Sequence, residues 1–463
     1  MSGKIVHIGC AAGFADERPD AGIAIAQTLA KCEGPRYLMY ETLGERTLAL
    51  AQLERRQDAR LGYTPQMDAF LRPILPLCHR HRIRIVANFG AANPLGAGER
   101  VLALARELDI ASLRVAVVEG DDLLAYVPEK TIRSWPIIEG IPLGDAEIIA
   151  ANVYLGATPV AEALAEGADV VILGRCADSA LALGPLMKEF GWQPGSWDLL
   201  AAGTLVGHLL ECGAHVSGGY FADPGYKNVP DLATLGYPIA QVSSNGECVI
   251  AKPAASGGLV SDRTVKEQLL YELHDPAHYL VPDVTLDVTS TEVKVIGPDR
   301  VYVAGARGST KPPTLKVTIS TEGGWLGEGE ISYAGPNSFA RARLAASVLR
   351  ERLRILDIRC PVRIDIIGTV STFDSDGGTL LDLGRFAPDG DYRVRMAGKS
   401  PDRAIATKIA KELIGLYSAG PAGGGGVRQS VTRRVQTHSA LIDPAIVRLT
   451  TRYLDVGPPV GAM

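Results

Sequence analysis

The sequence predicts an α/β fold with a mostly parallel, doubly wound sheet in the N-terminal half, followed by an α+β second domain. Over residues 1–234, short apolar runs that end at a turn residue alternate with amphipathic helical stretches. This rhythm is typical of a parallel sheet with helices on both faces. After about residue 235, alternating strand-like segments dominate, which indicates a second domain at residues 235–463.

The first domain is expected to contain six strands and the helices that connect them. The apolar runs lie at residues 5–9, 37–41, 83–90, 113–120, 148–156 and 170–174. The helical stretches lie at residues 20–30, 47–60, 66–80, 98–108 and 159–166. A longer helix follows, with Ser196 as its expected N-cap. Ligands bind such sheets at the carboxyl ends of the strands, so we expect a cleft there.

The second domain is expected to begin with strands and to end with two helices. The strand-like segments are residues 239–242, 247–252, 292–296, 301–304 and 314–320. Asn245-Gly246, between the first two, is a strong signal for a tight hairpin turn. Helices at 337–356 and 401–417, with strands at 362–367 and 391–397 between them, complete the prediction.

Composition excludes several classes of protein. The net charge is −5, with 47 basic and 52 acidic residues well mixed, and no basic stripe interleaved with aromatic residues points to nucleic acid. No apolar run approaches the roughly 18 residues that span a bilayer, and the opening MSGKIVHIGC enters a strand without a signal peptide. Seven scattered cysteines without a CxxC pair indicate a reducing compartment. We expect a soluble cytoplasmic protein.

Four reactive side chains fall on one face of the helix predicted around residues 203–219. His208, Glu211, Cys212 and His215 are spaced i, i+3, i+4 and i+7, within an arc of about 100°. Such a face can move protons, attack a carbonyl or hold a metal. The alternative is an apolar helix whose few polar residues are satisfied by neighbours. A break at Gly213 would move His215 off the face, so the catalytic candidates are His208, Glu211 and Cys212.

The loops after the strands supply the candidate substrate-binding residues. They are Asp16 and Arg18 after the first strand, Asn88 and Asn93 after the third, Arg175 and Asp178 after the sixth, and Lys252 and Gly257 in KPAASGG. An arginine beside free backbone N–H groups suits a carboxylate or phosphate. We expect the first six to face a common cleft that the Lys252 segment covers. The alternatives are a solvated loop, an Arg175–Asp178 ion pair and a plain glycine turn.

Known nucleotide and hydrolase motifs are incomplete. Gly9 and Gly13 lack the GxGxxG spacing of a dinucleotide site, and the chain has no GxxxxGK[ST] and no GxSxG. We therefore expect no organic cofactor. A metal held by His208, Glu211 and Cys212 or His215 is an alternative for the helix face.

Several longer segments resemble the acyclic terpene utilisation protein A family. They are GRCADSALALGPL, GHLLECGAHVSGGYFAD, GYPIAQVSSNGECVIAKPAASGG, VKEQLLYELHDPAHYLVPDVTLD, GFADERPDA and FGAANP. The resemblance covers most of the chain and implies a role in a catabolism whose intermediates are branched acyl-CoA esters. Family members often carry, or are encoded beside, a small ferredoxin-fold module. Because no copy is obvious in this chain, the resemblance implies a separate small partner subunit, and we also expect a homo-oligomer.

These observations favour a catabolic enzyme that acts on a small carboxylic acid or branched acyl-CoA. The leading prediction is a hydro-lyase in which Glu211 or His208 is the general base and the other is the general acid. One alternative is a hydrolase or acyl transferase with Cys212 as nucleophile. Another is a non-catalytic assembly subunit of a catabolic complex.

Overall fold

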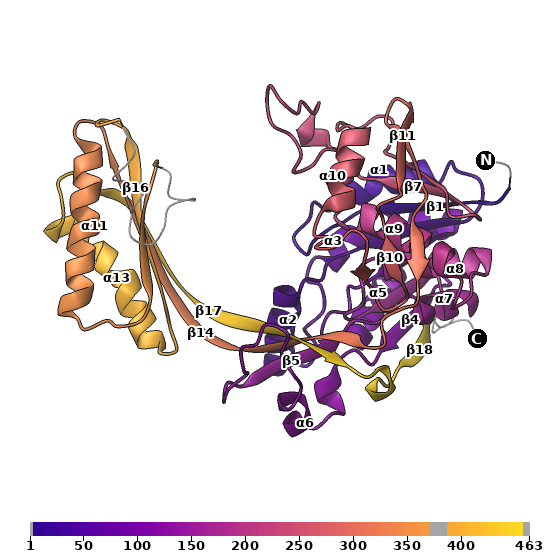
Figure 1. The fold of residues 1–463 in the computed structure, drawn as a ribbon, viewed down its shortest axis with the longest axis horizontal. Coiled ribbons are helices and arrows are strands. Elements are labelled where there is room, and N and C mark those ends of the chain that lie inside the picture. Colours follow the sequence, from indigo (N-terminus) through magenta and orange to yellow (C-terminus); the bar gives the residue numbers. More distant parts are fainter. Residues whose placement is uncertain (1–2, 370–386, 457–463) are drawn as a thin grey trace. The chain divides into compact units, whose positions relative to one another are not determined.

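The computed structural model describes residues 3–369 and 387–456. They fold into two compact units (Figure 1). Unit 1 contains residues 3–144, 148–320 and 437–456, and unit 2 contains residues 145–147, 321–369 and 387–436. The chain leaves unit 1 within β14 (Leu315–Ala334) and returns within β17 (Gly425–Ile442).

Unit 1 is built on a ten-stranded sheet with a parallel centre, which confirms the predicted fold class. The sheet order is β11-β12-β8-β7-β1-β2-β3-β6-β4-β18. The parallel strands are β1 (Ile5–Cys10), β2 (Arg36–Tyr40), β3 (Ile83–Ala87), β6 (Val170–Leu173) and β4 (Arg114–Glu119). Antiparallel strands flank them: β7 (Ile239–Ser243), β8 (Cys248–Ala251), β12 (Arg300–Ala304), β11 (Glu292–Gly297) and β18 (Thr450–Asp455).

Helices cover both faces of this sheet because successive residues of a strand point to opposite sides. In β2, Tyr37 and Met39 pack into one apolar cluster, whereas Leu38 and Tyr40 pack into the other. The first cluster includes residues of α7 (Thr158–Ala165), α8 (Ala180–Phe190) and α9 (Trp197–Glu211). The second includes residues of α1 (Ala21–Leu29), α4 (Leu75–His81) and α5 (Pro94–Glu107).

One predicted strand lies outside the parallel sheet. The run at residues 148–156 forms β5 (Ile148–Val153), which pairs with β14. β6 lies between β3 and β4, and β18 pairs with the outer edge of β4, so both edges of β3, β6 and β4 are occupied by strands other than β5.

The helix predicted at 66–80 is interrupted, and it forms α3 (Met67–Leu71) and α4.

The strands after residue 235 join the first sheet. The predicted Asn245-Gly246 hairpin connects β7 and β8, and β7 pairs antiparallel with β1, with Ile8 opposite Ala240. This pairing satisfies the backbone groups on the edge of β1 that the parallel strands leave open. The two compact units divide the chain near residues 320 and 437. The sequence pattern instead placed one boundary, between residues 234 and 235.

Unit 1 contains further helices and strands outside the ten-stranded sheet. They are α2 (Glu45–Gln57), α6 (Glu129–Arg133), α10 (Asp262–Leu270), β9 (Tyr279–Leu280), β10 (Thr285–Asp287) and β13 (Arg307–Ser309). Within the described residues, every helix is too short or too polar for a membrane crossing.

Unit 2 has the chain order β14, α11 (Ser338–Ile355), β15 (Val362–Ile367), β16 (Asp391–Ser400), α13 (Arg403–Ala419), β17. The strands lie in the order β15-β16-β14-β17, the βαββαβ arrangement of ferredoxin-like folds. Apolar residues of both helices, such as Leu349 and Leu413, pack with Val394 of the sheet. The expectation that this chain lacks a ferredoxin-fold module is therefore wrong.

Candidate functional site

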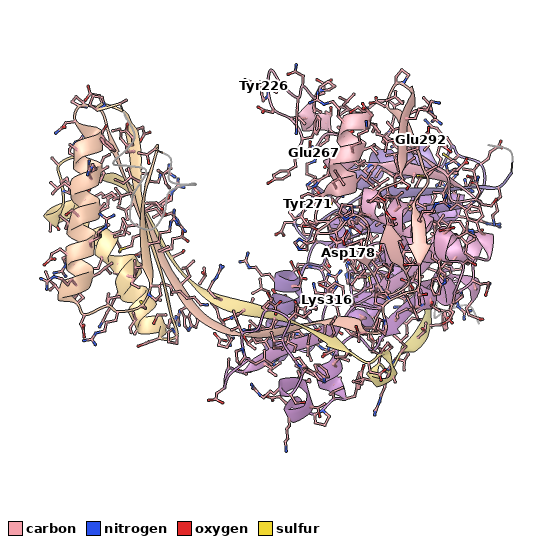
Figure 2. All side chains as sticks on the ribbon, viewed as in Figure 1. Asp178, Tyr226, Glu267, Tyr271, Glu292 and Lys316 are labelled. Atoms are coloured by element: carbon pink, nitrogen blue, oxygen red, sulfur yellow. The ribbon has the colours of Figure 1, made fainter. Side chains whose placement is uncertain are left out.

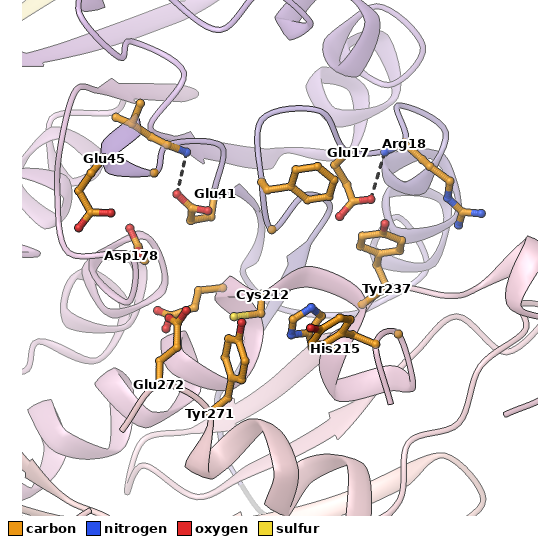
Figure 3. Close-up of a pocket in the computed structure, with 18 of the residues that line it drawn as sticks. Glu17, Arg18, Glu41, Glu45, Asp178, Cys212, His215, Tyr237, Tyr271 and Glu272 are labelled. Atoms are coloured by element: carbon orange, nitrogen blue, oxygen red, sulfur yellow. Dashed lines mark hydrogen bonds between the residues drawn. The ribbon is translucent and has the colours of Figure 1, made fainter. Parts of the chain in front are cut away.

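A cavity of about 800 Å³ opens in unit 1 where the parallel strands end (Figure 3). The loops after β1, β2 and β6 line it with residues that include Glu17, Glu41 and Asp178. The end of α9 lines it with Glu211 and Cys212. This volume is within the range of ordinary small-molecule sites, and the position is the one that parallel-sheet geometry predicts.

The cavity is strongly acidic and rich in tyrosine. Its described lining carries six carboxyl groups: Glu17, Glu41, Glu45, Asp178, Glu211 and Glu272. Three cationic side chains, Arg18, Arg175 and Lys316, also reach it. Five tyrosines complete the polar lining: Tyr154, Tyr220, Tyr237, Tyr271 and Tyr279. Figure 2 shows Asp178, Tyr271 and Lys316 on the same side of unit 1. Such a lining suits a ligand with hydroxyl or carbonyl groups better than a polyanion.

The end of α9 separates the four residues that the sequence places on one helix face. The helix stops at Glu211, Cys212 is its C-cap, and Gly213 has φ +55°. His215 lies on the 3₁₀ turn of residues Gly213–Ser217. Glu211, Cys212 and His215 nevertheless line the cavity, because the turn follows the helix end directly.

His208 lies behind Glu211 and is buried. Its Nδ1 is 2.9 Å from Oε1 of Glu211, and its Nε2 is 3.2 Å from the carbonyl oxygen of Leu269. Two acceptors around one ring are best satisfied by a doubly protonated imidazole. Burial alone would lower the pKa of His208, but the hydrogen bond and charge of Glu211 outweigh it and raise that pKa. His208 therefore orients Glu211, and the carboxylate is the member of the pair that reaches the cavity.

Glu41 is a second buried carboxyl in the cavity wall. Its Oε1 accepts the backbone N–H of Leu43 at 2.8 Å and Nδ2 of Asn88 at 2.9 Å, so a proton on this group belongs on Oε2. Burial raises the pKa of Glu41, and the charge of Glu211 adds to the effect, although Arg175 opposes it. Two carboxyl groups with different environments therefore share one cavity.

Cys212 and His215 lie in environments that suppress their charged forms. Burial raises the pKa of the Cys212 thiol, and the neighbouring Glu211 raises it further. Burial lowers the pKa of His215, whose ring stacks on Tyr220 with centroids 5.3 Å apart. A thiolate at Cys212 is thus disfavoured, and the His215 imidazole is neutral at neutral pH.

Arg175 holds the loop after β6 in place. Its guanidinium is buried, donates to the carbonyl oxygens of Leu43 and Cys176, and pairs with Asp178. It also lies over the ring of Tyr154, 4.5 Å from the centroid. The Arg175–Asp178 ion pair, one of the alternatives from the sequence, is therefore present. Arg175 contributes positive charge to the cavity wall, but its N–H groups donate to other residues of the protein.

Lys316 and Glu45 form a second charged pair at the wall. Nζ of Lys316 is 3.3 Å from Oε1 of Glu45, which also accepts the hydroxyl of Tyr154. Burial would raise the pKa of Glu45, but these two partners lower it to about 2. Glu45 is thus ionised at neutral pH beside the Lys316 ammonium.

The other predicted binding residues have different places. Arg18 lines the cavity and donates to the carbonyl oxygens of Ala233 and Leu235. Asp16 lies in a neighbouring pocket of about 310 Å³ and accepts a hydrogen bond from Gln66. Asn88 is buried behind Glu41, as described above.

Asn93, Lys252 and Gly257 support loops instead of lining the cavity. Asn93 caps α5 and donates to two backbone carbonyls. Lys252 pairs with Asp299 at 3.1 Å and bonds the carbonyl of Ser256. The N–H of Gly257 donates to the carbonyl of Thr234. Local hydrogen bonds and ion pairs occupy the polar groups that the sequence analysis assigned to substrate binding.

Sequence reasoning missed several residues of the lining. Glu41 directly follows the second strand, so the strand-end argument that selected Arg175 could have selected it. Lys316 and Tyr279 follow residue 235, in the part of the chain predicted to form the second domain. No local pattern marks them, because their position depends on the pairing of β14 with β5 and on the fold of the loop after α10.

The fold and the site define an α/β protein whose central sheet has helices on both faces. Its acidic cavity has the volume of a small-molecule site. Over residues 6–453 the chain matches the family described as Acyclic terpene utilisation family protein AtuA, and it belongs to this family. Membership implies a role in acyclic terpene catabolism. No curated protein matches the chain.

Proposed function

We propose that the protein is a hydro-lyase that adds water to, or removes it from, a small 3-hydroxy carboxylic acid or its branched acyl thioester. The observation that carries the proposal is the pair of carboxyl groups, Glu211 and Glu41, that line one cavity in different environments. Enzymes separate acid and base roles in this way, by holding one carboxyl group protonated and its neighbour ionised.

In the dehydration direction, the Glu211 carboxylate removes a proton from the carbon next to the carbonyl. The electrons of that C–H bond form the C=C bond, and the C–O bond to the hydroxyl breaks. The protonated Glu41 donates its proton to the leaving hydroxyl, which departs as water. Glu211 is then protonated and Glu41 ionised, and exchange with solvent restores both.

Two further groups support this chemistry. Negative charge that develops on the carbonyl oxygen would be stabilised by the Lys316 ammonium, which lines the same cavity. His208 keeps Glu211 oriented through the 2.9 Å contact. Because six carboxyl groups line the cavity, we place the acyl part of a thioester inside it and leave the phosphates of a CoA carrier outside.

Solvent exchange tests the proposal without knowledge of the natural substrate. The protein is incubated in D₂O with 3-hydroxybutanoate, 3-hydroxyoctanoate and their N-acetylcysteamine thioesters, and deuterium at C2 is followed by proton NMR. We expect exchange with at least one probe and its loss in Glu211→Gln. The control is Glu272→Gln, which makes the same change at an exposed wall position. Unchanged exchange in Glu211→Gln would remove Glu211 from the mechanism.

The alternatives make different predictions. A Cys212 nucleophile requires a thiolate, which burial and Glu211 oppose, and it predicts iodoacetamide labelling of Cys212 at neutral pH. Metal ligation by His208, Glu211 and Cys212 predicts stoichiometric metal in protein purified without chelator. If the chain is a non-catalytic assembly subunit, activity is expected only in a complex isolated from the native host. The proposed small partner and homo-oligomer would be found in that complex, although unit 2 already supplies a ferredoxin-like module within this chain.

A further inference from the structure

A second, smaller pocket adjoins the acidic cavity. Its volume is about 230 Å³, below the range of whole-ligand sites. The two pockets share four lining residues: Tyr154, Asp178, Tyr279 and Lys316. Their common wall contains the proposed charge-stabilising Lys316, so a ligand that reaches Lys316 from the cavity is already at the boundary of the smaller pocket.

The smaller pocket differs from the cavity in chemistry. Beyond the shared residues, its lining is mainly apolar and includes Ala177, Leu280, Val281, Pro282, Leu315 and Leu441. Leu280 is 62% exposed and Leu441 is 50% exposed, although leucine side chains gain free energy when they are buried. An apolar ligand group laid against them would remove this surface from water.

We propose that the pocket lined by Leu280, Val281 and Leu441 binds the hydrocarbon chain of the ligand whose reacting end occupies the acidic cavity. The ligand is therefore an amphiphile, with a hydroxyl and carbonyl group at one end and an alkyl chain at the other. This inference rests on the proposed function for the reacting end. The occupant is a small molecule because the pocket shares Tyr154, Tyr279 and Lys316 with the cavity that holds the reacting end.

Binding of a homologous series measures the alkyl contact without any turnover. The probes are butanoate, hexanoate and octanoate, with the matching 1-alkanols as neutral head groups, and Kd is obtained by ligand-observed NMR. For the wild-type protein we expect Kd to fall by about fourfold for each added methylene that enters the pocket. Agreement between acids and alcohols would assign the effect to the alkyl chain.

Two variants alter the pocket in different ways. Leu280→Asp places a charge at an exposed lining position, and Thr314→Trp fills the pocket from a partly exposed one. Both should flatten the dependence on chain length and leave the affinity for butanoate within about twofold. The control is Ile138→Asp, because Ile138 is 59% exposed and lies outside both pockets.

The outcomes separate this inference from the proposed function. A wild-type dependence that survives in both variants, or no dependence at all, overturns the alkyl pocket. Deuterium exchange that persists in that case leaves the hydro-lyase proposal standing. A chain-length dependence that the two variants remove supports the pocket, even where no exchange is seen with any hydroxy acid.

Discussion

The carboxyl group of Asp121 accepts the backbone N–H of Arg175, with Oδ2 and N 2.8 Å apart. The same oxygen accepts Nδ2 of Asn152 at 2.8 Å. Asp121 follows β4, so one buried side chain ties the ends of β4, β5 and β6 together. Gly174 permits this approach, because a Cβ there would lie 2.5 Å from Oδ1 of Asp121.

Asp121→Asn should make the free energy of unfolding less dependent on pH. Burial raises the pKa of Asp121 to about 7, whereas an unfolded aspartate titrates near 3.9. The stability that the protonated form contributes is therefore complete below about pH 4 and is lost as the pH rises to about 7. Relative to the variant, the wild-type protein should lose up to about 4 kcal/mol over this range, measured by urea unfolding.

Asp109→Asn is the control for this change, because Asp109 is exposed and its positive φ of 55° is tolerated by asparagine. Other buried carboxyl groups titrate in all three proteins and cancel in the comparison. Parallel stability curves for the wild-type protein and Asp121→Asn would show that Asp121 is ionised at no measurable cost.

Asn88→Leu should destabilise the protein by about 2–4 kcal/mol in urea unfolding. Oδ1 of Asn88 accepts the backbone N–H of Thr42 at 2.8 Å, and its Nδ2 donates to Glu41. Leucine would leave both buried partners without these bonds. Asn228→Leu, at an exposed position, should change stability by less than about 0.5 kcal/mol. Equal effects of the two substitutions would contradict the role given to Asn88.

Local patterns in the sequence were sufficient to predict the central part of the fold. Apolar runs and helix signals predict the alternation from β1 to β6 because strand and helix periods are local properties. The place of β5 and of the β7–β8 hairpin depends on which strand edges are free after the centre has formed. No window of sequence contains that information.

The site was predicted in part for the same reason. Glu211 and Cys212 were found because they crowd together on one helix, and Asp178 because it follows a strand. Whether a side chain faces the cavity or a neighbouring carbonyl depends on tertiary contacts. Asn93 and Lys252 are polar and near strand ends, yet their groups are engaged by nearby loops, so chemistry and position alone misplaced them.

Gly13→Ala should destabilise the protein by about 1–3 kcal/mol and weaken ligand binding. A Cβ on Gly13 would lie 2.4 Å from the backbone carbon of Cys212 and 2.6 Å from the nitrogen of Gly213. Backbone atoms at the end of α9 cannot move away as a flexible side chain could. Gly44→Ala is the matched control in the same cavity wall, because a Cβ there meets nothing within 4 Å. Equal melting temperatures for the two variants would contradict the close approach.

His208→Gln should destabilise the protein most at low pH. The pKa of His208 is raised in the folded state, so the stability from its pairing with Glu211 is complete below the unfolded value of about 6.5. That stability is lost as the pH rises through the folded pKa. We expect a loss of about 1–3 kcal/mol at pH 6, measured by urea unfolding, and a smaller loss at pH 9.

A double-mutant cycle with Glu211→Gln isolates the pair itself. The coupling energy between His208 and Glu211 should be present at pH 6 and diminished at pH 9, whereas His79→Gln, at an exposed position, should show no coupling at either pH. Because His208 orients Glu211 without reaching the cavity, His208→Gln should also shift the pH profile of deuterium exchange and keep part of the exchange rate. Complete loss of deuterium exchange in His208→Gln, together with a coupling energy that is the same at pH 6 and pH 9, would instead place His208 in direct contact with the substrate.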